Sequence, residues 1–199
     1  MATSADGGRT WRDGAIPGLT VCAGGIADFA SAPRLSIGGD GTVYFSGLAG
    51  SATAEPPPVA IVASRSLDGG RTWEVPTTVA PAEPGNDTDS ITASPTRDGH
   101  AYAYLVWAAW EHSYQPPMSN AFWFARSADR EASWQQEHLA GPFDLCTAPN
   151  HRLGEYQGLA GLRRGFVAVV TMTGPPAQDG PSDIVVARVG AGRHEGAGR

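Results

Sequence analysis

An eight-residue motif occurs three times at a nearly constant spacing, and this repeat is the feature that most constrains the fold. The copies are SADGGRTW from Ser4, SLDGGRTW from Ser66 and the more divergent SADREASW from Ser127. Their aspartates, Asp6, Asp68 and Asp129, lie 62 and 61 residues apart. A step this constant over two intervals indicates a structural repeat, so one unit of the fold comprises about 60 residues.

Each unit also predicts the same series of short strands. Segments rich in β-branched and aromatic residues end in arginines at matching spacing, at Arg65, Arg126 and Arg188. A glycine followed by alternating residues lies upstream of each arginine, and a shorter apolar segment precedes that glycine. A fourth strand is predicted to begin at the motif tryptophan, as in TWEVPTTVA. An antiparallel four-stranded unit repeated at fixed spacing is typical of a β-propeller blade, because its faces stay wet until neighbouring sheets stack on them.

Composition agrees with an all-β fold and excludes several functions. With 26 Gly and 16 Pro in 199 residues, the chain is interrupted too often for long helices. No run of apolar residues is long enough for a membrane span, so we expect no membrane partner. The net charge is -6 and no run of basic residues is present, which argues against nucleic acid as a partner.

The motif has a structural explanation at its position between the third and fourth strands. The aspartate can accept hydrogen bonds from the turn, and the glycines permit the positive φ that a tight reversal requires. We therefore assign structural roles, and no catalytic role, to Asp6, Trp11, Asp68, Trp73, Asp129 and Trp134. The third copy has Arg130 and Glu131 where the other two copies have glycines, which predicts a looser turn there.

The pattern Ser-x-Asp-x-Gly-x-Thr-Trp resembles the Asp-box, or BNR repeat, of sialidases and their relatives. The segments CAGG at Cys22, NDTDSITASP at Asn86 and LGEYQGLA at Leu153 are similar to successive blades of bacterial sialidase-like proteins. The resemblance implies a six-bladed propeller of which this chain matches the C-terminal half, as in an exo-α-sialidase. It also implies an extracellular or secreted parent protein, although the N-terminus shows no signal-peptide pattern.

On this basis we expect about three blades, a partial propeller over residues 1–190. The expected parts are a blade end at 1–30, blades at 31–80 and 88–140, a last blade at 155–190 and a flexible tail at 191–199. Two interpretations remain open for the missing blades: an N-terminal half has been lost, or a homodimer completes the ring. In the dimer, the strand after Trp11 would complete the partner's last blade.

Strand direction predicts which polar residues gather on the rim opposite the motif turns, where propeller glycosidases of this kind carry their chemistry. The residues expected on this rim are Asp28, Arg34, Asp87, Asp89, Trp110, Glu111, His112, Tyr114, Asp144, His151, Arg152, Glu155 and Tyr156.

The resemblance implies a tyrosine nucleophile, because a carboxylate nucleophile would be repelled by the carboxylate of sialic acid. Tyr156 is the candidate nucleophile, and Glu111 is the candidate carboxylate that takes the phenol proton, with Glu155 a poorer choice. Arg34 and Arg152 are the candidate ligands of the substrate carboxylate, where the family uses three arginines. Trp110 is a candidate for stacking on a sugar ring, with packing between blades as the alternative.

Two hypotheses of function follow. The first is a sialidase-like glycoside hydrolase, or a fragment of one that is incompetent alone, acting on terminal sialic acids. The second is a non-catalytic Asp-box propeller that binds glycans or proteins. Neither requires a cofactor, and no histidine pair has metal-ligand spacing, so no metal site is expected. Cys22 and Cys146 form either one disulfide or two free thiols.

Overall fold

The computed structural model describes residues 1–53, 57–94, 102–111, 119–127, 134–144, 157–162, 165–177 and 180–189. Within these ranges, the side chains of residues 88, 111, 142–144, 165, 172–183 and 189 are not described.

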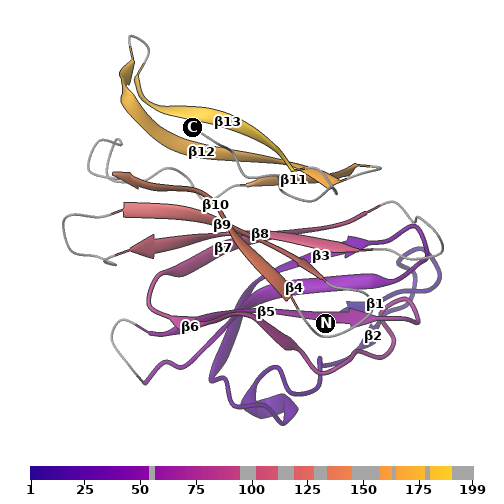
Figure 1. The fold of residues 1–199 in the computed structure, drawn as a ribbon. Coiled ribbons are helices and arrows are strands. Elements are labelled where there is room, and N and C mark those ends of the chain that lie inside the picture. The colour runs from indigo at the N-terminus through magenta and orange to yellow at the C-terminus, as the bar shows by residue number, and fades with distance from the viewer. Residues whose placement is uncertain are drawn as a thin grey trace.

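Three antiparallel sheets form successive layers of the molecule (Figure 1). The first sheet contains β3 (Phe29–Ile37), β4 (Val43–Gly50), β5 (Val59–Ser66) and β6 (Thr77–Glu83), in that order. The second contains β7 (Asn86–Ala93), β8 (Ala103–Glu111), β9 (Ser119–Ser127) and β10 (Trp134–Asp144). The third contains β11 (Gly158–Leu162), β12 (Gly165–Ala177) and β13 (Gly180–Val189). The all-β class that we predicted is confirmed.

A small hairpin precedes the first sheet. Its strands β1 (Ala2–Thr3) and β2 (Arg12–Asp13) pair with each other on either side of the first motif. We predicted only the strand after Trp11, and in the structure this strand already has a partner in its own chain. The short 3-10 helix η1 (Val21–Ala23) follows, and no helix in the described part of the chain has the length and apolarity of a membrane span.

One strand starts later in the chain than predicted. The strand after the second motif begins at Thr77 and not at Trp73 as predicted. Glu74 N still donates to Arg65 O, at 3.0 Å, but Pro76 follows and has no N–H to continue the ladder. The strand therefore starts after the proline.

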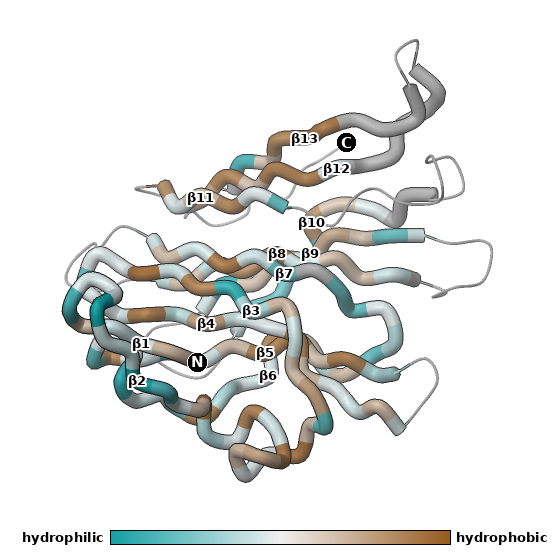
Figure 2. The backbone as a smooth tube through the Cα atoms, turned by 180° about the vertical axis from the view of Figure 1, so that it is seen from behind, coloured by the Kyte–Doolittle hydropathy of each residue, from teal (hydrophilic) through white to brown (hydrophobic). Residues whose placement is uncertain are grey.

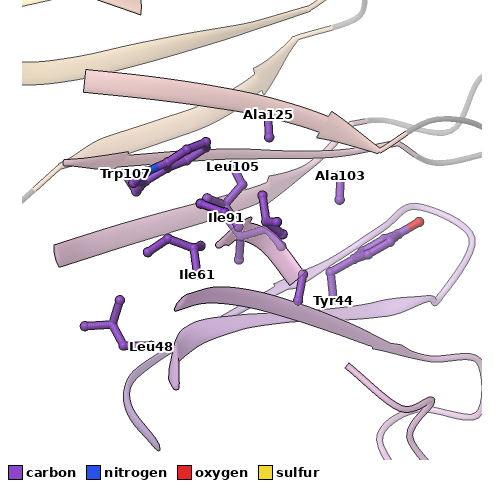
Figure 3. Close-up of a cluster of buried hydrophobic side chains, with 11 residues drawn as sticks. Tyr44, Leu48, Ile61, Ile91, Ala103, Leu105, Trp107 and Ala125 are labelled. Carbon is purple, nitrogen blue, oxygen red and sulfur yellow. The ribbon is translucent and has the colours of Figure 1, made fainter. Parts of the chain in front are cut away.

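Each sheet packs its apolar face on the next sheet. Between the first and second sheets the core includes Leu48, Ile61, Ile91, Leu105 and Trp107, which point toward one another in Figure 3. A second cluster joins the second and third sheets, and its members are Tyr104, Val106, Ala108, Phe122, Phe124, Phe166, Ala168 and Val170. The far face of the first sheet is covered by the segment before β3, whose Ile16 packs with Phe45, Ala49 and Val62.

Candidate functional site

The first two motif turns have the same hydrogen bonds atom for atom. In the first turn, Asp6 Oδ1 accepts from the backbone N–H of Thr10 at 2.9 Å, and Asp6 Oδ2 accepts from Thr10 Oγ1 at 2.7 Å. In the second turn, Asp68 accepts from the N–H and hydroxyl of Thr72 at the same 2.9 and 2.7 Å. The motif aspartates are thus occupied in organising their turns.

The glycines and tryptophans of these two turns also behave alike. Gly8 and Gly70 have φ of +86° and +87°, in the left-handed region that favours glycine. The indole N–H of Trp11 donates to Gly8 O at 3.0 Å, and that of Trp73 donates to Gly70 O at 3.2 Å. The positive φ of the glycines is the conformation that the sequence predicted, whereas the indole hydrogen bonds were not predicted.

The third motif is only partly described. Asp129, with the other residues of 128–133, lies outside the described residues, so the looser turn predicted there stays a prediction. Trp134 is described, and its indole N–H donates to Thr77 Oγ1 of the first sheet at 3.2 Å. The third motif tryptophan therefore joins two sheets, unlike the first two.

The candidate catalytic residues are mostly outside the described part of the chain. Tyr156 and Arg152 both fall there. Glu111 is the last residue of β8, paired in the ladder with Ser119, and its side chain is not described. Trp110 is half-buried, and its backbone N–H donates to Gly85 O at 2.8 Å. Trp110 and Glu111 thus lie at the end of the second sheet where β7 begins.

Arg34 is the predicted site residue whose surroundings are best described. It lies in β3, opposite Ser46 of β4, and its side chain is exposed. Its Nε donates to the backbone oxygen of Asp89 in β7, at 3.2 Å. No hydrogen bond from its two terminal nitrogens to any described residue is present. The guanidinium is therefore held through Nε, and none of the described residues accepts a hydrogen bond from its terminal nitrogens.

Asp89 lies beneath this arginine at the junction of the first two sheets. We predicted that Asp89 lies on the rim opposite the motif turns, but it is only 2% exposed. Ser46 Oγ, itself fully buried, donates to Asp89 Oδ2, while Oδ1 has no hydrogen-bond partner among the described residues. Strand alternation contains a signal for this burial, because Asp89 lies on the same face of β7 as the core residue Ile91.

Burial changes the acidity of Asp89. Loss of solvation raises its pKa from 3.8 to about 6, against the opposing effects of the Ser46 hydrogen bond and the charge of Arg34. The neighbouring carboxylate of Asp87 adds to the increase. Asp89 therefore changes charge near neutral pH, directly below the exposed guanidinium of Arg34.

The strands that carry Arg34 and Asp89, β3 and β7, each have a register shift next to that residue. The β3–β4 ladder shifts register between Ser31 and Arg34, where Ala32 has a φ of +49°, unusual for a residue other than glycine. The β7–β8 ladder shifts between Asp87 and Asp89. Bulges of this kind redirect side chains and are common beside functional sites.

The cysteines, the possible metal ligands and the repeated arginines do not add to this site. Cys22 is an exposed free thiol, and Cys146 lies outside the described residues. Among the described residues, no three His, Cys, Asp or Glu side chains cluster in a way that could hold a metal ion. Arg65, one of the repeated arginines, pairs with Glu74 at 2.8 Å beside the second motif turn.

The structure defines a class, an all-β chain of layered antiparallel sheets with repeated aspartate-centred turns. No family model and no curated protein matches the chain. It is similar to the crystal structure of a protein of unknown function from Dyadobacter fermentans DSM 18053, with a TM-score of 0.52 and 16% sequence identity. The match covers 94% of this chain and 53% of that one, so the chain spans about half the length of its structural relative. At this identity the likeness concerns the fold alone.

Proposed function

We propose that the three sheets are blades of an Asp-box β-propeller of the sialidase-like kind, and that the chain binds the acidic terminal sugars of glycans through Arg34. The observation that carries the proposal is the Arg34 guanidinium, which is anchored through Nε and whose terminal nitrogens have no hydrogen-bond partner among the described residues. Such a group suits a carboxylate, which the two terminal nitrogens can bind together in a bidentate contact.

Support for the propeller comes from the repeat and the layering together. Two successive four-stranded sheets and a third sheet pack in chain order, each by the face that carries its repeated apolar positions. The second motif turn joins the third and fourth strands of the first sheet, as in an Asp-box blade, and the first motif turn joins β1 to β2 with the same hydrogen bonds. An additional three blades would be needed to close a six-bladed ring of the family.

Charge at Asp89 gives this binding site a pH dependence. Below its pKa of about 6, Asp89 is neutral and leaves the positive charge of Arg34 uncompensated. Above that pH, the buried Asp89 carboxylate offsets the positive charge of Arg34 and so weakens its attraction for an anionic sugar. Affinity for a carboxylate ligand is therefore expected to be higher at pH 5 than at pH 7.5.

Hydrolysis is a second candidate, with Tyr156 as nucleophile, Glu111 as its base and Arg152 as a further carboxylate ligand. The observation in its favour is that β8 ends at Glu111 on the side of the second sheet where β7, the strand of Asp89, begins. Asp89 is too buried to touch a sugar, so in this scheme it only adjusts the charge near Arg34.

Binding of sialyllactose, with lactose as the neutral comparison, tests the proposal by titration calorimetry. Arg34→Gln should weaken sialyllactose binding about tenfold or more, as expected for loss of a charged hydrogen-bonding group. Arg65→Gln is the matched control, since Arg65 is already paired with Glu74, and it should bind normally. Equal affinity for the two sugars would refute recognition of the acidic group.

A fluorogenic sialoside distinguishes binding from hydrolysis. Turnover by the purified chain that Tyr156→Phe abolishes, while sialyllactose still binds, would establish the hydrolase. Binding without turnover in the wild-type chain would leave the binding module as the function and exclude catalysis by this chain alone.

A further inference from the structure

The outward face of the third sheet is apolar and uncovered. On β13, Ile184 is 74% exposed and Val186 is 64% exposed. Val169 of β12, which pairs with Val186 in the ladder, is exposed beside them. Both strands include brown, hydrophobic stretches in Figure 2. Contiguous exposed aliphatic side chains on a sheet mark an interaction surface.

The repeat identifies the corresponding positions in the other sheets. Arg65, Arg126 and Arg188 pair across their ladders with Tyr44, Tyr104 and Val167. This alignment equates Ile184 with Ile61 in the first sheet and with Phe122 in the second. Both of those side chains are buried where one sheet packs on the next.

Val186 also aligns with buried residues of the other two sheets. Its equivalents, Ala63 and Phe124, are likewise buried against the following sheet. The uncovered face of the third sheet is therefore the face that, in the two preceding sheets, receives another sheet of the same repeat.

The complementary surface is partly uncovered at the other end of the stack, on β3. Leu35 is 55% exposed and Ile37 is 70% exposed. The ladders pair Leu35 with Phe45 and Ile91 with Leu105, which makes Leu35 the equivalent of Ile91. Ile91 packs into the first sheet's core, whereas Leu35 has no such cover.

The face of the first sheet that carries Leu35 is covered by other residues only over its central strands, β4 and β5. The segment before β3 buries Phe45 and Val62 with Ile16 and Leu19, but it leaves the β3 edge open. The open edge is the part of the surface that the first strand of each following sheet uses for packing: β7 contacts β3, β4 and β5.

We propose that a second copy of this chain docks head to tail, its β3 edge covering the third-sheet face defined by Val169, Ile184 and Val186. A second copy is the occupant because this polypeptide carries both halves of an interface that it forms twice within itself. The contact joins different surfaces, and its closure by two copies rests on the propeller proposed above, in which the three sheets of one chain make half a ring. Two copies then satisfy both ends at once around a twofold axis. It needs no exchange of strands, since β2 is paired with β1 of its own chain.

Light scattering during size-exclusion chromatography of the full chain, over a wide concentration range, tests this docking. The wild-type chain should be a dimer. Val186→Asp and Ile37→Asp should each give monomers with unchanged circular dichroism, and the milder Val186→Ser should weaken the dimer without loss of fold. Leu67→Asp, at an exposed leucine in the second motif turn, is the matched control and should remain dimeric.

Mixing the two variants identifies which surfaces meet. Val186→Asp retains an intact β3 edge, and Ile37→Asp retains an intact third-sheet face. These two unchanged surfaces can bind each other, so the mixture should form heterodimers through one of the two interfaces. A wild-type monomer at all concentrations would overturn the proposal. A dimer that survives Ile37→Asp would also overturn it, because the third-sheet faces would then pair with each other.

Discussion

At the scale of the residue, the motif aspartates act as acceptors for their own turns. Asp68 receives hydrogen bonds from the Thr72 backbone, the Thr72 hydroxyl, the Ser66 hydroxyl and the Arg71 backbone. These donors, with the Thr72 backbone N–H foremost, lower its pKa from 3.8 to about 2. Asp6 has a pKa of about 2 for the same reason, led by the Thr10 hydroxyl. The ionised carboxylate is thus the form that the folded turn prefers.

Asp68→Ala should lower the melting temperature by a few degrees at pH 7, because the turn donors lose their acceptor. A folded pKa below the unfolded value gives stability that is present above about pH 4 and is lost as the pH falls through about 2. The gap between wild type and variant should therefore close over that range in thermal scans. Asp68→Asn keeps one acceptor oxygen, so its melting temperature should lie between those of the wild type and Asp68→Ala. A difference in melting temperature that does not change with pH would contradict the role of the charge.

Asp89→Asn should have the opposite pH signature. The pKa of Asp89 is raised to about 6, so its contribution to stability is full below about pH 4 and is lost as the pH rises through 6. The wild-type chain should lose on the order of 2 kcal/mol over this range, and the amide variant should not. Urea denaturation at pH 4.5 and pH 7.5 measures the difference, and parallel curves for the two proteins would refute the buried carboxyl.

At the scale of the element, the motif tryptophans differ in what they hold together. Trp11 and Trp73 bond within their own turns, whereas Trp134 bonds to Thr77 of the preceding sheet. The neighbouring Gln136 also donates to the preceding sheet, at Val79 O. The first residues of β10 therefore hydrogen-bond the second sheet to the first.

A double-mutant cycle of Trp134→Phe and Thr77→Val tests this fastening. The two changes remove the same hydrogen bond, so their effects on unfolding free energy should fail to add by about 1 kcal/mol. Trp73→Phe combined with Thr77→Val is the control, and these changes should be additive because Trp73 donates to Gly70 O. Additivity in both cycles would show that the contact contributes nothing to sheet packing.

At the scale of the whole molecule, the stacking order of the sheets decides which repeated residues become core. Ile61 and Ile184 are the same amino acid at equivalent repeat positions, yet Ile61 is 0% exposed and Ile184 is 74% exposed. The difference is the presence of a following sheet on one and its absence on the other.

Ile61→Ala should therefore cost about 2–5 kcal/mol of unfolding free energy, as for other large-to-small core substitutions. Ile184→Ala should change it by no more than about 0.5 kcal/mol at protein concentrations low enough to keep the chain monomeric. Chemical denaturation of both variants provides the measurement. Comparable losses would mean that the third-sheet face is covered within the single chain.

The sequence predicted much of the fold because its signals are local. The positions of the strands follow from turn glycines and alternation, and the motif turns from donors and acceptors within eight residues. The prediction failed at the start of β6, where Pro76 interrupts the ladder, and at β1, whose two residues are too few to form a pattern.

Less of the candidate site could be predicted from the sequence, because its contacts join residues far apart in the chain. Arg34 was expected as a ligand of the substrate carboxylate, but its anchor on the Asp89 carbonyl joins residues 55 positions apart. The roles of Tyr156, Glu111 and Arg152 remain predictions, since their side chains lie outside what the structure describes.

By itself, the sequence determined the all-β class, the repeat and the hydrogen bonds of the motif turns, because each depends on residues close together in the chain. Only the tertiary structure decided that Asp89 is buried under Arg34, that Trp134 reaches Thr77 and that Leu35 and Ile184 stay exposed. Period-2 alternation gives a strand two faces but does not state what lies against either of them. That depends on which sheet packs next, a long-range property that burial of apolar surface between layers settles.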